Sequence, residues 1–156
     1  MALNTNVIIL SETETVQIAS DKKIRVEVTV KNAGSQNLSG NFYLDIFYAD
    51  TLSDPYDEPA DTYVTWLLED EAHDTRYIYS HTLEAGVSET WDGESPVNAS
   101  TWPEGSKIDA GIVLRWEGAG GEIYYLDVLK IADAIEIVAP TQRPIVEITE
   151  VVFSEA

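Results

Sequence analysis

Residues 24–31 alternate apolar and polar side chains without a break, in the order Ile-Arg-Val-Glu-Val-Thr-Val-Lys. Successive side chains of a β-strand point to opposite faces, so this period of two predicts a strand with one buried and one solvated face. Residues 32–35, Asn-Ala-Gly-Ser, are turn formers that end the strand. A second alternating set follows and predicts the next strand; its apolar members are Phe42, Leu44, Ile46 and Tyr48.

Further β-prone segments, separated by turn signals, lie at residues 63–68, 77–83, 87–91, 107–116, 123–129, 131–138 and 145–153. The segment at 87–91 ends at Asp92-Gly93, a dipeptide typical of tight hairpin turns. Residues 67–74 are compatible with one helical turn, but no segment has an apolar stripe of helical period. The pattern therefore predicts an all-β fold, an antiparallel β-sandwich of about seven to nine strands.

The turn motifs resemble those of the immunoglobulin-like CARDB family of bacterial and archaeal surface proteins. In that family a strand ending in Val-x-Asn-x-Gly, here residues 30–34, leads through a short polar loop to the next strand. The sequences Leu-Glu-Ala-Gly at 83–86 and Trp-Pro-Glu-Gly at 102–105 also match, each before a strand. The resemblance covers about residues 16–138 and implies an immunoglobulin-like sandwich. It implies no activity, because one fold serves many functions.

The length of 156 residues fits one domain. The connection at 50–76 is longer than the family pattern, and the β-prone segment after Pro144 is additional to it. We therefore expect residues 1–156 to form a single immunoglobulin-like domain, with 139–156 as an extra or exchanged C-terminal strand.

The charge is strongly negative, with 28 Asp and Glu residues against nine Lys and Arg and a net charge of −19. Binding to nucleic acid or to an anionic membrane surface needs clustered basic side chains, so we expect neither partner. No apolar run approaches the ~18 residues of a membrane span, and no signal peptide is visible at the start. The charge is also uneven, because ten acids and no base lie between Lys31 and Arg76. The bases of the early part of the chain are Lys22, Lys23, Arg25 and Lys31.

The acidic connection is a candidate calcium site, whose carboxylates are Asp50, Asp54, Asp57, Glu58 and Asp61. Calcium takes six to eight oxygen ligands, which clustered carboxylates can supply. The spacing departs from the EF-hand template, because Pro55 follows Asp54 and no glycine stands at the sixth position. A solvated, self-repelling loop is the favoured alternative. We expect no cofactor other than this calcium ion.

Two tryptophans are candidates for carbohydrate binding, because an indole face can stack on the apolar face of a pyranose. Trp91 and Trp102 stand beside the turn sequences Asp92-Gly93 and Pro103-Glu104-Gly105, which predicts positions on loops. The favoured alternative is core packing, since a small sandwich needs large residues inside it.

Catalytic patterns are weak in this chain, so we expect no enzymatic activity. The sequence has no cysteine and no Gly-x-Ser-x-Gly elbow, and its histidines are His73 and His81. With 28 acids in the chain, any chosen carboxylate pair is uninformative about glycosidase chemistry.

Apolar β segments stand near both termini and are candidate interface strands: Val7, Ile8, Ile9 and Leu10, then Val146, Ile148, Val151 and Phe153. Such a strand can pair with the sheet edge of a neighbour. The leading prediction is a non-catalytic structural or assembly protein of a virion or an extracellular surface: a virion decoration or capsid-associated protein, or a filament subunit. Its partner would be a second copy or a larger assembly. The alternative is a carbohydrate- or calcium-binding adhesion module.

Overall fold

The computed structural model describes residues 7–10, 15–52 and 73–140, and these contain eight strands and one 3-10 turn. The elements are β1 (Val7–Leu10), β2 (Val16–Ala19), β3 (Lys23–Asn32), β4 (Leu38–Ala49), β5 (His73–Leu83), β6 (Ser88–Asn98), η1 (Ala99–Thr101), β7 (Lys107–Glu117) and β8 (Ile123–Val138). The all-β prediction is confirmed. None of the described segments is a helix long and apolar enough to span a membrane.

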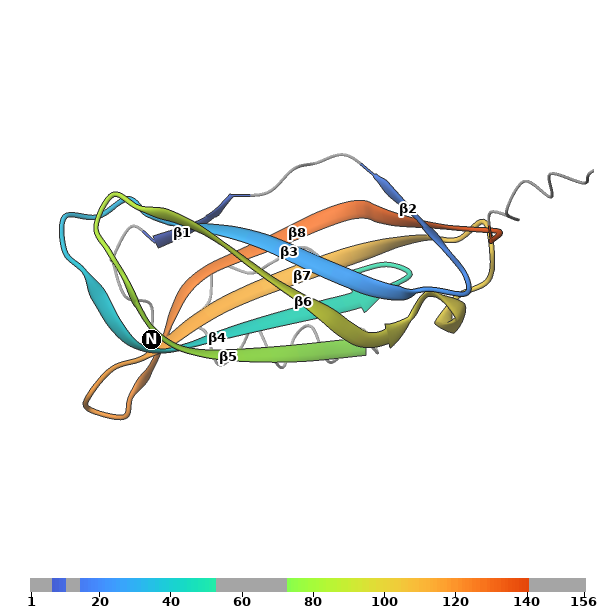
Figure 1. The fold of residues 1–156 in the computed structure, drawn as a ribbon. Helices are drawn as coiled ribbons and strands as arrows, with labels where there is room; N and C mark the ends of the chain where they lie inside the picture. Colours follow the sequence, from blue (N-terminus) through green and yellow to red (C-terminus); the bar gives the residue numbers. More distant parts are fainter. Residues whose placement is uncertain (1–6, 11–14, 53–72, 141–156) are drawn as a thin grey trace, which may run out of the picture.

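The strands form two layers, and in Figure 1 β3 and β6 are drawn across the strands of the other sheet. One sheet has the order β1-β3-β6, and the other has the order β2-β8-β7-β4-β5. The first part of the chain gives one strand to each layer, because β1 pairs with β3 and β2 pairs with β8. This arrangement is the predicted β-sandwich.

One pairing departs from the predicted antiparallel arrangement. Strands β2 and β8 are parallel, with Val16 opposite Ile135 and Ala19 opposite Val138. Antiparallel neighbours in sequence are joined by a hairpin, but β2 and β8 are far apart along the chain. Their relative direction is therefore decided by how the chain crosses between the layers and not by a turn.

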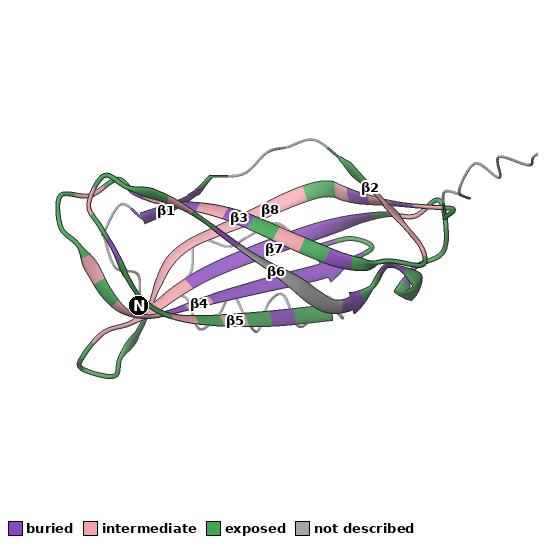
Figure 2. Ribbon diagram, viewed as in Figure 1, coloured by how far each residue is buried: buried purple, intermediate pink, exposed green. Residues whose placement is uncertain are grey.

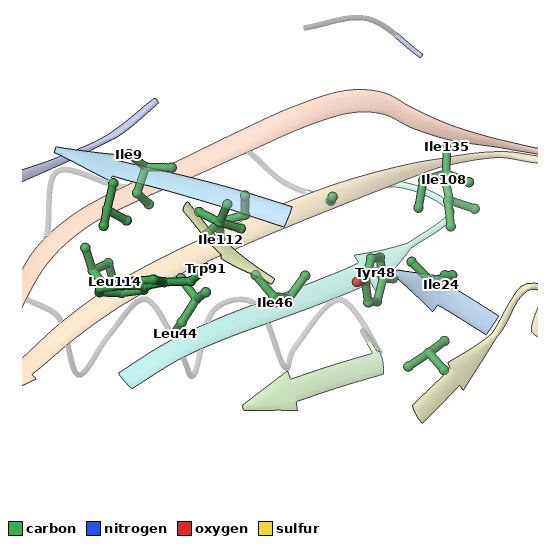
Figure 3. Packing of buried hydrophobic residues seen from close by; sticks show 14 of the residues in the cluster. Ile9, Ile24, Leu44, Ile46, Tyr48, Trp91, Ile108, Ile112, Leu114 and Ile135 are labelled. Carbon is green, nitrogen blue, oxygen red and sulfur yellow. The ribbon is translucent and has the colours of Figure 1, made fainter. Parts of the chain in front are cut away.

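The core lies between the two layers, where the period-two side chains meet. The predicted inward set of β4, Phe42, Leu44, Ile46 and Tyr48, is almost completely buried. Opposite it, Ile24, Val28 and Val30 of β3 are buried, while Arg25 and Glu27 between them are exposed (Figures 2 and 3). The alternation in the sequence thus predicts which side chains of these strands face the core.

The outward side of β4 is also buried, which the alternation does not predict. Phe47 and Ala49 form a second apolar cluster with Leu52 and Val113. In the same face the carboxylate of Asp45 is inaccessible, and it accepts hydrogen bonds from Arg76 Nε at 2.6 Å and Arg115 Nη2 at 2.8 Å. A buried charge is stable only when it is paired in this way.

Asn32 explains the Val-x-Asn-x-Gly turn motif. Its side chain is buried at the end of β3, and Nδ2 donates to the carbonyl oxygens of Gln36 and Leu83 at 2.8 and 3.0 Å. Its Oδ1 accepts from the Gly34 amide at 3.0 Å. One asparagine therefore closes its own turn and fastens that turn to the end of β5.

Two predicted boundaries are wrong. Asp92-Gly93 does not form a turn, because β6 continues through it, with Asp92 opposite Glu27 and Gly93 opposite Val26 of β3. Pairing along the whole of β3 outweighs the local turn preference of this dipeptide. The predicted segments at 123–129 and 131–138 form a single strand, β8. The predictions for 63–68 and 145–153 lie outside the described residues, as do most of 67–74 and of 139–156.

Candidate functional site

Two sheet edges meet on one side of the sandwich. Among the described strands, β5 ends the five-stranded sheet and β6 ends the three-stranded sheet. Between them lies a hollow of about 630 Å³, lined by residues 78–81 of β5 and 89–91 of β6. We call this hollow the β5–β6 opening.

The β5–β6 opening is built from aromatic rings around Trp91. The indole is buried and packs edge-on against the core residue Phe42, at 5.5 Å between ring centroids. Tyr79 lies 4.8 Å from the indole at an interplanar angle of 35°, and Tyr77 lies 6.4 Å from Tyr79 at 22°. Tyr77 and Tyr79 are half-buried. Tyr79 lines the β5–β6 opening, whereas Tyr77 lies outside its lining and has a buried hydroxyl oxygen.

A polar pair stands at the rim of these rings. His81 Nε2 and Glu89 Oε2 are 2.5 Å apart, and their side chains are 39% and 29% exposed. Trp91 Nε1 donates a longer hydrogen bond, 3.4 Å, to the same oxygen. A carboxylate has about four lone-pair directions on its two oxygens, so Glu89 keeps capacity to accept from a ligand.

The two predicted tryptophans do not share a surface. Trp91 belongs to β6 and not to a loop, which corrects the prediction from Asp92-Gly93. Trp102 lies outside the strands, directly after η1, which agrees with the predicted loop position. Its side chain is nevertheless buried and packs against Tyr48 and His73. Both indoles thus occupy core positions, as in the favoured alternative. Of the predicted pair, only Trp91 reaches the β5–β6 opening, as its floor.

Two residues that carry the chemistry of the β5–β6 opening were missed, namely Tyr79 and Glu89. A usable signal exists in the sequence, because residues 77, 79 and 81 alternate along one strand and 89 and 91 along another. The sequence does not say that these two sets face one another, since β5 and β6 belong to different sheets.

The predicted calcium ligands fall almost entirely outside the described residues. Asp50 is exposed just after β4, beside a hollow of about 460 Å³ that His73 and Trp102 also line. The remaining carboxylates, Asp54, Asp57, Glu58 and Asp61, are not described. Within the described ranges no three acidic or histidine side chains are grouped as a metal would require. The calcium site stays a prediction.

The predicted N-terminal interface strand has two different faces. Val7 and Ile9 point inward and belong to the core, so they are not available to a partner. Ile8 and Leu10 point outward and are 39% and 41% exposed. The C-terminal candidates, Val146, Ile148, Val151 and Phe153, lie outside the described residues.

The free side of β1 is capped at one point by β8. The backbone amide of Ile9 donates a 2.7 Å hydrogen bond to Asp127 Oδ2, and the Val128 amide donates to Oδ1 at 2.9 Å. Burial raises the pKa of Asp127, and the two amide hydrogen bonds act in the opposite direction. A carboxylate that satisfies an edge amide blocks strand addition at that position.

Comparison with known proteins gives no matching family model and no matching curated protein. The resemblance to the CARDB family therefore stays a prediction based on turn motifs.

Proposed function

We propose that this chain is a non-catalytic structural protein that assembles with further copies of itself through the outward face of β1. The observation that carries the proposal is the exposure of Ile8 and Leu10 on a terminal strand. Burying apolar surface in a contact contributes about 25 cal/mol per Å² removed from water. Two large side chains on a four-residue strand therefore form a compact contact patch.

The contact is made by side chains and not by strand addition. The Ile9 amide at the free side of β1 is already bound by Asp127, so a neighbouring strand would find this donor occupied. Ile8 and Leu10 belong to the outer face of the three-stranded sheet, where they stand opposite Lys31 and Thr29 of β3. A partner that covers this face buries them without disturbing the hydrogen bonds of β1.

Charge supports a second copy as the partner. The outer face of β3 carries Lys23, Arg25 and Lys31 with Glu27 among them, so bases outnumber acids there, whereas the whole chain has a charge of −19. A face with an excess of bases on an acidic protein complements the remaining surface of another copy. Such a contact joins two different surfaces, and it builds rings or open filaments. A virion decoration protein, a capsid-associated protein and a filament subunit are the forms of assembly that we propose, on a virion or an extracellular surface.

Sedimentation velocity over a range of concentrations tests this proposal. We expect the wild-type chain to associate, and the variants Ile8→Glu and Leu10→Glu to remain monomeric. The matched control is Ile78→Glu, a substitution at a 59% exposed position on β5, and it should associate like the wild type. Added salt should weaken association by screening the charge contribution. A wild-type chain that stays monomeric, or β1 variants that still associate, would contradict the proposal.

A further inference from the structure

We infer that the β5–β6 opening is a binding site for a neutral saccharide. This site is separate from the assembly surface, because β5 and β6 close one side of the sandwich and β1 contacts β8 on the other. The inference rests on the aromatic rings, the polar pair and the charge of the chain. Each of these features favours a different property of the ligand.

The aromatic rings demand a ligand with an apolar surface. Tyr79 is half-buried and lines the hollow at a sheet edge, so part of its side chain is accessible to a ligand. Trp91 fixes the Tyr79 ring from one side at 4.8 Å, so Tyr79 meets a ligand in a defined orientation. The C–H face of a pyranose packs on aromatic rings of this kind, and a pre-oriented ring loses little entropy on binding.

The polar pair demands a ligand with hydroxyl groups. Glu89 is an acceptor held in place by His81, and His81 is oriented in turn by the Trp91 ring at 6.4 Å and 89°. A carboxylate accepts hydrogen bonds from hydroxyls, and an imidazole nitrogen can donate or accept. Acceptor and aromatic surface lie side by side in one hollow, which matches the alternation of C–H faces and hydroxyls on a sugar ring.

The charge of the chain selects a neutral ligand. Phosphate- or carboxylate-bearing ligands are repelled by a chain of charge −19 and by Glu89 itself. A cation such as a quaternary ammonium needs a cage of ring faces around one point. The ring pair that lines the β5–β6 opening is Tyr79 and Trp91, tilted at 35° to one another. A single tilted pair does not form such a cage, so it fits the flat side of a sugar ring better than a compact cation.

Calorimetric titration of the full chain with neutral tetrasaccharides of glucose, mannose, xylose and N-acetylglucosamine tests the inference. We expect at least one of them to bind and to shift the indole Nε1–H NMR signal of Trp91, with the signal of Trp116 unchanged. No binding at millimolar concentration would overturn the inference. Binding of choline instead of every saccharide would also overturn it.

Variants locate the site independently of folding. We expect Tyr79→Ala and Glu89→Gln each to weaken binding by about tenfold or more, which equals 1.4 kcal/mol. Tyr79→Phe keeps the ring and should bind within about threefold of the wild type. Tyr124→Ala, a change on β8 where the ring stacks on Trp116, is the matched control and should bind normally. Saccharide binding that survives Glu89→Gln and Tyr79→Ala would place the ligand elsewhere and contradict the inference.

Discussion

Asp127 accepts a hydrogen bond from the backbone amide of Ile9, 2.7 Å away and 118 residues earlier in the chain. The bond ties the first strand of one sheet to the last strand of the other. A β-bulge makes it possible, because the register of β8 against β7 shifts between Leu114 and Arg115 and brings Asp127 opposite the core residue Leu114. The Asp127 side chain therefore turns toward β1.

The first prediction concerns pH. Burial raises the pKa of Asp127 above its ordinary value of 3.8, so the folded chain holds this proton more tightly than the unfolded chain. The contribution of Asp127 to the free energy of unfolding is then largest below 3.8 and decreases as the pH rises through the folded pKa. Asp127→Asn removes this titration. We expect the wild type to lose stability relative to Asp127→Asn over that range, measured by urea unfolding at a series of pH values. A difference that does not change with pH would contradict the prediction.

The second prediction concerns the buried carboxylate of Asp45. Its removal leaves Arg115, which is 13% exposed, without its counter-ion. Breaking a buried ion pair on one side typically costs about 3–5 kcal/mol. The side chain of Arg76, the second partner of Asp45, is 44% exposed, so water can solvate it after the change. We therefore expect Asp45→Asn to lower the free energy of unfolding in urea by about 3 kcal/mol or somewhat less. Glu84→Gln, at an exposed turn position, is the control and should change stability by less than about 0.5 kcal/mol.

The third prediction concerns Gly40 in β4. Its φ of +147° is rare for other residues, and a Cβ placed there would lie 2.2 Å from the carbonyl oxygen of Glu117. It would also lie 2.8 Å from Trp116 Nε1, which donates to the Ser39 carbonyl. Gly86 has a positive φ of +77° too, but open space around it. We expect Gly40→Ala to lower the stability of the fold by more than Gly86→Ala does. Gly86→Ala strains the backbone alone, at a cost of about 1 kcal/mol. Thermal unfolding followed by tryptophan fluorescence measures both, and equal losses would argue against the close contact.

The fourth prediction separates two asparagines of the same turn region. Asn32 uses its Nδ2 group to donate to two carbonyl oxygens, so Asn32→Asp replaces a donor by a negative charge facing acceptors. We expect a loss of about 3 kcal/mol or more. In the hydrogen bond described for the Asn37 side chain, Oδ1 accepts from the Ala85 amide at 2.9 Å. Asn37→Asp keeps that acceptor and should stay within about 1 kcal/mol of the wild type in urea unfolding. Similar losses for both variants would show that the donor role of Asn32 is unimportant.

Much of the local structure could be predicted from short stretches of sequence. The alternation at 24–31 and in Phe42, Leu44, Ile46 and Tyr48 predicts the core-facing side chains of β3 and β4, because strand geometry converts a period of two into two faces. It does not predict the burial of Asp45, Phe47 and Ala49 on the other side of β4. Asp92-Gly93 misled for the opposite reason: the turn preference is local, and pairing with β3 is not.

The candidate site was only partly predictable. Trp91 was singled out, but for a loop position that it does not occupy. Its partner Glu89 stands two residues before it on β6, whereas Tyr79 comes from β5 in the other sheet. Ile8 is exposed and its neighbour Ile9 is buried. This difference follows from the alternation of side chains once β1 is known to be a strand at the edge of a sheet.

By itself, the sequence determined the β class, the faces of the central strands and the uneven charge, because these depend on side-chain order and composition within a few residues. Only the tertiary structure decided which edges lie together. The parallel pairing of β2 with β8 and the bulge that turns Asp127 toward Ile9 join residues far apart in the chain. The meeting of β5 with β6 joins consecutive strands, but it brings together the edges of two different sheets. Such contacts depend on how two sheets stack and close their edges, and no local pattern of side chains encodes that.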